Sequence, residues 1–174
     1  MGDFVRILLD KLHEWWPIRI VDAGNQGVKY RQDGTAECLQ PGWHWFWPKA
    51  QRIEEVACQY QNVDCGLQSL TTKDGREVSL SLNVGYSISD AALLWTSFQH
   101  FDTSLINMAR GHAAEIVCES EWEELASDPQ GLGQEIQEAL QEDVESFGVR
   151  IEDVTADQLS RARTYRLLQS QSLV

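Results

Sequence analysis

Residues 71–90 read TTKDGREVSLSLNVGYSISD. From Val78 to Ile88 every second residue is apolar, and the residues between them are Ser, Asn or Gly. This period of two is typical of a β-strand with one buried face. Lys73-Asp74-Gly75, just before it, has the composition of a hairpin turn. The stretch therefore predicts a long, half-buried strand that is entered through a hairpin.

Shorter strand-like segments precede this strand. Turn residues at 25–27, 32–34 and 39–42 separate them. The expected strands cover residues 18–21, 28–31, 43–47, 53–63 and 67–72. In the expected strand 43–47, the period of two places Trp43, Trp45 and Trp47 on one side and His44 and Phe46 on the other.

The period changes after Asp90. Apolar spacing predicts helices over residues 91–98, 104–125 and 132–147, a strand over 149–154 and a last helix from Ala156 to about Leu168. Strands followed by helices indicate an α+β fold. We expect four parts: an N-terminal amphipathic helix in 1–17, a mainly β subdomain over 18–70, an α/β subdomain over 71–155 and a C-terminal helix over 156–174.

The N-terminal helix is expected to span residues 3–16 and to end before Pro17. Its charged residues fill one side, and its apolar residues gather within an arc of roughly 140° at about 100° per residue. The apolar side carries Phe4, Val5, Leu8, Leu9, Leu12, Trp15 and Trp16.

Composition excludes several classes of protein. The 174 residues include 27 acidic and 14 basic side chains, a net charge of −13, which argues against nucleic-acid binding. The four cysteines form no C-x-x-C pair, so we expect no metal and no cofactor. No window of about 20 apolar residues could span a membrane.

The sequence also offers no convincing active site, and we expect neither catalysis nor a small-molecule substrate. A small hydrolase that uses His112 or Cys118 is the weakest alternative. His112 with Glu115 is better interpreted as a polar pair on a helix surface, and Cys118 as a buried filler.

Four motifs in order resemble the SPFH, or prohibitin-homology (band 7), domain of stomatins, prohibitins and flotillins. The first is the early turn Asn25-Gln26-Gly27-Val28. The second is Leu39-x-Pro41-Gly42-Trp43-His44-Trp45 with Pro48. The third is the stretch 71–90, and the fourth is Gly148-Val149-Arg150-Ile151-x-Asp153-Val154. The resemblance covers about residues 18–168, without the usual spanning anchor before it or a long coiled coil after it.

The resemblance implies a non-enzymatic scaffold that self-associates on the cytoplasmic side of a membrane. Such a scaffold would organise lipid or regulate a membrane protein such as a protease. The expected membrane or partner contacts are the apolar side of the first helix and the residues Trp43, Trp45, Phe46 and Trp47. The expected self-association residues are Arg161, Arg163, Arg166 and Leu167. The alternative is a soluble structural or interaction protein that assembles without lipid.

Overall fold

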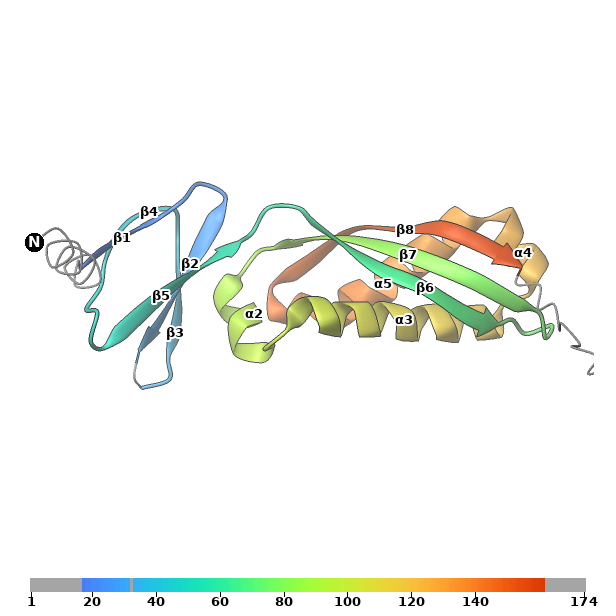
Figure 1. The fold of residues 1–174 in the computed structure, drawn as a ribbon, viewed down its shortest axis with the longest axis horizontal. Coiled ribbons are helices and arrows are strands. Elements are labelled where there is room, and N and C mark those ends of the chain that lie inside the picture. Colours follow the sequence, from blue (N-terminus) through green and yellow to red (C-terminus); the bar gives the residue numbers. More distant parts are fainter. Residues whose placement is uncertain (1–16, 32, 162–174) are drawn as a thin grey trace, which may run out of the picture.

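A computed structural model describes residues 17–31 and 33–161. Figure 1 shows an elongated molecule with a small all-β lobe at one end and a longer lobe of sheet and helices at the other. Strands β1–β5 form the first lobe, and β6–β8 with the helices α3, α4 and α5 form the second. The α+β fold expected from the sequence is confirmed. The expected N-terminal helix lies outside the described residues.

The first lobe combines a three-stranded sheet with a two-stranded ribbon. The sheet has the order β3 (Ala36–Leu39), β2 (Asn25–Arg31), β5 (Gln51–Ala57). The ribbon pairs β1 (Ile18–Val21) with β4 (Gly42–Trp45), and all of these pairs are antiparallel.

The expected turn at 25–27 is wrong, because these residues already pair with β5 as the start of β2. The turn lies before them: Asn25 N–H donates to the Asp22 carbonyl at 3.1 Å, and Gly24 takes a φ of 92° that favours glycine. Strand β3 was not anticipated, since nothing in its four residues shows a clear alternation.

The second lobe is an antiparallel sheet in the order β6 (Gln61–Thr71), β7 (Glu77–Ile88), β8 (Val149–Arg161). In β7 the six apolar side chains that alternate from Val78 to Ile88 are all buried, so this prediction is confirmed. Strand β6 pairs with β7 on both sides of an irregularity between Asp64 and Leu67, so this sheet begins at Gln61. Two strands were expected over 53–63 and 67–72. The structure has two strands here as well, but the break between them falls at residues 58–60, between β5 and β6.

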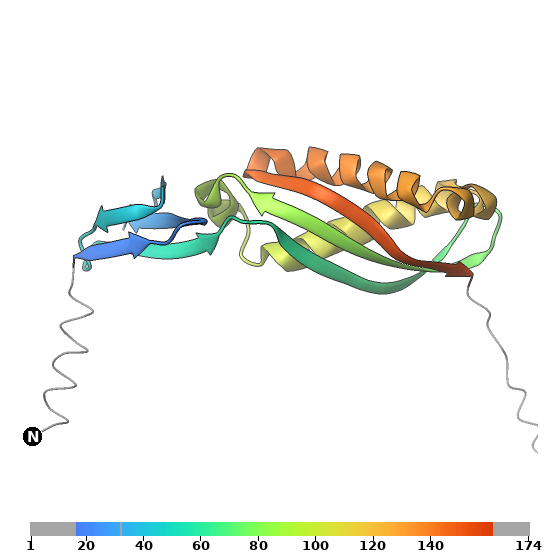
Figure 2. The same ribbon diagram turned by 90° about the horizontal axis from the view of Figure 1, so that it is seen from above.

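The described residues include four α-helices: α2 (Ala91–Ser97), α3 (Phe101–Glu119), α4 (Trp122–Ser127) and α5 (Pro129–Val144). Helix α3 packs on β6 and α5 on β8, whereas α2 contacts β2 and β3 of the first lobe and α4 contacts α5. Seen from above, α3 and α5 run along the sheet (Figure 2), and they contact each other. The α5 face formed by Leu132, Ile136, Leu140 and Val144 is buried, as the spacing predicts.

The expected single helix over 104–125 is wrong at both ends. It starts three residues earlier, at Phe101, and breaks at Ser120, whose backbone is extended. Glu121 and Glu124 then form a capping box that starts α4 as a separate helix. The α5 helix likewise starts earlier than expected, because the Asp128 side chain caps it and Pro129 occupies its first turn.

The helix expected from Ala156 is also wrong over the described residues. Strand β8 continues to Arg161, since Leu80 pairs with Leu159 and Val78 pairs with Arg161 on the neighbouring β7. The outer edge of β8 is partly covered by glutamines of α5. Gln137 Nε2 donates to the Glu152 carbonyl at 3.0 Å, and Ile151 N–H donates to Gln141 Oε1 at 2.8 Å.

Candidate functional site

The β1–β4 ribbon carries the most exposed aromatic side chains of the described residues. Ile20 lies opposite Trp43 in the ribbon, and Ile18 lies opposite Trp45. Directly opposed residues of an antiparallel pair project from the same face. The exposed fractions are 74% for Trp43, 64% for Trp45 and 48% for Ile20, and Trp47, two residues further on, is 63% exposed. We call Ile20, Trp43, Trp45 and Trp47 the tryptophan surface.

The opposite face of the ribbon is anchored to the three-stranded sheet. Val21 is 2% exposed, and its Cγ2 lies so close to Gly27 that a Cβ there would meet it at 2.8 Å. The buried Val28 and Ile53 continue this small core. At the ribbon's edge, Arg19 Nε lies 4.0 Å from a carboxylate oxygen of Glu55. The ribbon face that carries Val21 is therefore covered by the sheet, and the face that carries Trp43 and Trp45 is exposed to solvent.

The backbone at Trp47 is held by a tight turn. Ala50 N–H and Gln51 N–H both donate to the Trp47 carbonyl at 2.9 Å, and Trp47 N–H donates to Gln51 Oε1 at 3.0 Å. Phe46 N–H donates to the Pro17 carbonyl at 2.9 Å, which ties the end of the ribbon to the start of β1. These hydrogen bonds therefore fix the backbone that carries the Trp47 side chain.

The structure agrees with the expected alternation around the tryptophans. Trp43, Trp45 and Trp47 are exposed, whereas His44 and Phe46 are half-buried. His44 Nε2 lies 2.6 Å from the Gln40 carbonyl oxygen. Sequence reasoning missed Ile20. The period of two already placed it on one face of β1, but the pairing of β1 with β4 is what brings it to the tryptophans.

Of the residues expected to mediate self-association, only Arg161 is described, and it is exposed at the end of β8. The remaining expected contacts lie outside the described residues, and they are Phe4, Val5, Leu8, Leu9, Leu12, Trp15, Trp16, Arg163, Arg166 and Leu167.

Charge is divided unequally between the two lobes. Residues 17–57 contain five acidic and five basic side chains, whereas residues 58–161 contain nineteen acidic and five basic ones. The lobe with the tryptophan surface is thus neutral, and the net negative charge belongs to the other lobe. The five cations of the first lobe are Arg19, Lys29, Arg31, Lys49 and Arg52.

An aromatic groove of about 360 Å³ lies where the two lobes meet. Trp95, Phe98 and Phe101 line it, and Phe98 and Phe101 pack edge to face with ring centroids 5.4 Å apart. Tyr86 OH donates to Asp102 Oδ1 at 2.6 Å inside the groove, and burial raises the pKa of this phenol above its ordinary value. The groove therefore has an aromatic wall, and polar side chains that include Asp102, Gln99 and His100 complete its lining.

Several titratable groups of the described residues are buried or paired, whereas Cys118, expected as a buried filler, is exposed. Burial raises the pKa of the Cys65 thiol to about 11 and also raises the pKa values of Cys38 and Cys58, so these thiols are neutral near pH 7. His112 Nε2 lies 2.8 Å from Asp143 of α5, and its Nδ1 lies 3.7 Å from Glu115. Within residues 17–31 and 33–161, no three His, Cys, Asp or Glu side chains are grouped to hold a metal.

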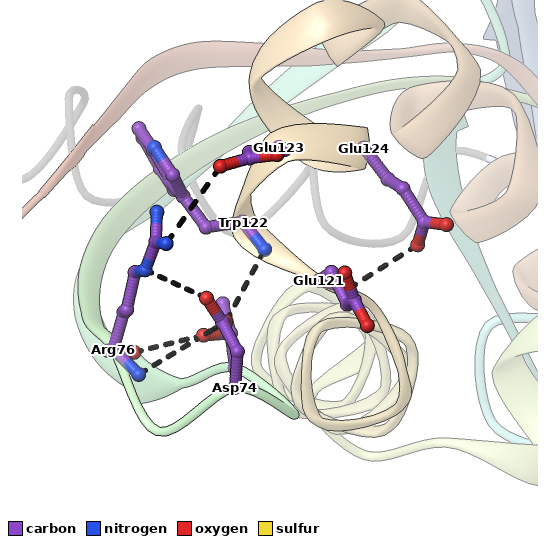
Figure 3. Close-up of polar contacts among 7 residues, drawn as sticks. Asp74, Arg76, Glu121, Trp122, Glu123 and Glu124 are labelled. Atoms are coloured by element: carbon purple, nitrogen blue, oxygen red, sulfur yellow. Dashed lines mark hydrogen bonds and ion pairs between the residues drawn. The ribbon is translucent and has the colours of Figure 1, made fainter.

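A polar cluster joins the β6–β7 hairpin to α4 (Figure 3). Arg76 Nε lies 2.6 Å from Asp74 Oδ2, and its guanidinium lies 3.8 Å from Glu123. Asp74 also accepts from Thr72 Oγ1 and from the backbone N–H of Trp122. The hydrogen bond from Thr72 is the main reason that the pKa of Asp74 lies below its ordinary value. This cluster fixes the β6–β7 turn to the start of α4.

No helix within the described parts of the chain has both the length and the apolar character needed to cross a bilayer.

The family model described as "SPFH domain / Band 7 family" matches residues 19–166, most of the chain. An uncharacterized protein of Archaeoglobus fulgidus is 23% identical over 134 residues, which are 77% of this chain and 54% of that protein. An uncharacterized protein of Methanocaldococcus jannaschii is 23% identical over 142 residues, which are 82% of this chain and 71% of that protein. The chain thus spans about half the length of the Archaeoglobus relative.

Proposed function

This chain belongs to the SPFH domain / Band 7 family, and we propose that it is a non-enzymatic scaffold that self-associates at a membrane surface. The family is generally one of membrane-associated, non-enzymatic scaffolds. The single observation that carries the membrane part of the proposal is the tryptophan surface, an apolar face on a neutral lobe.

Indole side chains suit the boundary between lipid headgroups and acyl chains. The ring is largely apolar, while its N–H finds an acceptor at the headgroup level. Ile20, Trp43 and Trp45 share one exposed face of the ribbon, and Trp47 is exposed just beyond the end of β4. Together they exceed the scattered apolar residues of an ordinary soluble surface, and such patches mark contacts with lipid or protein.

The charge distribution favours one orientation at the membrane. Anionic lipid repels acidic protein surface, and the repulsion falls off within a Debye length of about 8 Å in physiological salt. The neutral lobe can approach such a surface, whereas the acidic lobe is repelled from it. We therefore propose that the tryptophan surface contacts the bilayer and that the helices of the second lobe lie away from it, on the cytoplasmic side.

The expected affinity of one copy is low. Full burial of one large apolar side chain contributes about 1.5–3 kcal/mol, so partial insertion of four such residues contributes on the order of 5 kcal/mol. That corresponds to a dissociation constant of roughly 0.2 mM. Several copies held together would bind far more tightly, because the second and later contacts become intramolecular. Self-association and membrane contact thus support each other in this proposal.

Liposome flotation tests the membrane part. The wild-type chain should float with vesicles of phosphatidylcholine and phosphatidylserine, and a variant with Trp43, Trp45 and Trp47 changed to Gln should remain at the bottom. Trp95→Gln is the matched control, because Trp95 is 48% exposed but lies on α2, outside the tryptophan surface.

Equal flotation of the wild type and the triple variant would remove the tryptophan surface from the proposal. A wild-type chain that forms a monodisperse oligomer and ignores vesicles would favour the alternative, a soluble structural protein whose copies cover this surface.

A further inference from the structure

Strand β6 forms one edge of the second-lobe sheet, and Figure 2 shows it along one side of the molecule. Beyond the irregularity between Asp64 and Leu67, it pairs regularly with β7 as far as Thr71. In an antiparallel pair, successive residues direct their backbone N–H and C=O groups alternately toward the neighbouring strand and away from it. The hydrogen bonds at the end of this stretch therefore show which of its residues face away from β7.

Three alternate residues of β6 direct their backbone groups to the open side of the sheet. Thr72 N–H donates to the Arg76 carbonyl across the hairpin at 3.0 Å, so Thr72 faces β7. In steps of two, Leu70 and Gln68 face β7 as well. The residues that alternate with them face outward, and we call them the outward residues. They are Leu67, Ser69 and Thr71.

Contacts with α3 and the residue that follows it close both ends of this open stretch. The Arg110 side chain donates to the Cys65 carbonyl through Nε at 2.8 Å and also through Nη2. Lys73 N–H donates to the Ser120 carbonyl at 3.0 Å, and this bond agrees with the alternation because Lys73 lies two residues beyond Thr71. Between these contacts, the backbone groups of the outward residues have no hydrogen-bond partner within residues 17–31 and 33–161.

The open stretch of β6 lacks the usual protection of an exposed sheet edge. Proteins protect such edges with charged residues, with proline or with a covering element. The edge of β8 has such protection, because Gln137 and Gln141 cover part of it and Asp157 adds a charge. Residues 65–72 contain no charged residue and no proline, and Leu67 is 61% exposed. This edge is therefore open to pairing with another strand.

The position of α3 decides which kind of strand fits this edge. Helix α3 packs on β6. Neighbouring strands lie about 4.8 Å apart, whereas the axes of packed helices need about 8–10 Å. A second copy joined through its own β6 would bring its α3 to about 4.8 Å from this one, which is too close. The edge therefore fits a single extended segment with no helix packed on it.

Charge narrows the choice of segment. The second lobe is acidic, and three exposed carboxylates lie on the elements that form this edge: Asp64 on β6, and Glu115 and Glu119 on α3. A segment with basic residues is attracted to such a surface, and an acidic one is repelled.

We propose that residues 67–71 bind an extended, basic segment of a partner protein as a fourth strand of the second-lobe sheet. An antiparallel segment would form about six hydrogen bonds, because each outward residue offers one N–H and one carbonyl. A β-branched side chain opposite Leu67 would cover its exposed surface. The contact lies on β6, outside the tryptophan surface, so it goes beyond the proposed membrane contact.

Hydrogen exchange of backbone amides, followed by NMR on the full-length chain, tests both the edge and its partner. In the free chain, the N–H groups of Gln68 and Leu70 should exchange slowly, and those of the outward residues should exchange fast. The probe is a short peptide of alternating valine and threonine with a lysine at each end. It is N-methylated along one edge, so that it can pair with one strand only. Its binding should slow exchange at the outward residues about tenfold.

Two matched controls accompany the probe. A peptide of the same sequence that is N-methylated along both edges lacks the donors that β6 needs, and it should not bind. On the protein side, Ser69→Pro removes the central outward N–H without removing a hydrogen bond to β7. It should weaken binding of the probe about tenfold in fluorescence anisotropy, whereas Ser69→Ala keeps the N–H and should bind as the wild type does. Circular dichroism checks that each variant is folded, and the two peptides decide the question if Ser69→Pro is not.

Equal binding of the two peptides would overturn the inference, and so would binding that leaves exchange at the outward residues unchanged. A probe that does not bind at about 1 mM would also overturn it. Slow exchange at the outward residues of the free chain would do the same, because it would show that a second copy already occupies the edge. Peptide binding and liposome flotation are separate measurements, so this inference and the membrane proposal can fail independently.

Discussion

Ile20 lies directly opposite Trp43 in the β1–β4 ribbon, and both side chains are turned to solvent, at 48% and 74% exposure. One residue further along β1, Val21 is almost completely buried against the sheet. A step of one residue therefore separates the core of the first lobe from its outer apolar surface. The tryptophan surface is therefore exposed to solvent while Val21 keeps the other face of β1 packed in the core.

The two faces of the ribbon should respond differently to substitution. Trp43→Gln loses mainly the cross-strand contact with Ile20 and should lower the free energy of unfolding by about 0.2–1 kcal/mol. Val21→Ala removes two buried carbon atoms and should cost about 2 kcal/mol. Urea unfolding followed by circular dichroism measures both. A larger loss for Trp43→Gln would contradict the placement of the two faces.

Gly27 should tolerate no side chain. An added Cβ would meet Val21 Cγ2 at 2.8 Å, so Gly27→Ala should lower the free energy of unfolding by about 1–3 kcal/mol. Gly111→Ala is the control, because that position on α3 has open space and should gain about 0.5–1 kcal/mol in helix propensity. Thermal melts should move in opposite directions. Equal melting temperatures for the two variants would refute the close packing of β1 on β2.

Gln141 should stabilise the edge of β8. Gln141→Ala leaves the N–H of the buried Ile151 without its acceptor, which should cost about 1–3 kcal/mol in urea unfolding. Gln134→Ala, at an exposed position of the same helix, should change stability by less than about 0.5 kcal/mol. If both variants unfold alike, the edge is not capped by this glutamine.

Asp74 should make stability depend on pH. Its pKa is lowered in the folded chain, chiefly by the hydrogen bond from Thr72, so its contribution is complete well above the unfolded pKa of about 3.9. The contribution is lost as pH falls through the folded pKa. Asp74→Asn should therefore be less stable than the wild type at pH 7, and the difference should shrink at pH 3. A difference that does not change between these two pH values would contradict this role.

Much of this architecture follows from local sequence pattern. The alternation from Val78 to Ile88 and the one-sided spacing of α5 give the right elements, because each pattern repeats over many residues and each face is buried as a unit. The alternation of Trp43, Trp45 and Trp47 is likewise strong enough to assign their common side.

Other features depend on partners that are distant in the chain. Residues 156–161 have helical spacing, but pairing with β7 makes them strand. The break at Ser120 depends on the capping box that begins at Glu121 and on the hydrogen bond from the Trp122 N–H to Asp74 in the β6–β7 hairpin. The role of Ile20 depends on the β1–β4 register, and sequence gives no direct sign of it.

Quenching of tryptophan fluorescence by brominated lipid tests the central claim most directly, because bromine quenches only indoles that enter the acyl region. Vesicles with brominated acyl chains should quench the wild type and Trp95→Gln to the same extent. The variant lacking Trp43, Trp45 and Trp47 should be quenched much less than the wild type, and the quenching that is left comes from its other tryptophans, Trp15, Trp16, Trp95 and Trp122. Unchanged quenching in that triple variant, or none in the wild type, would contradict the account.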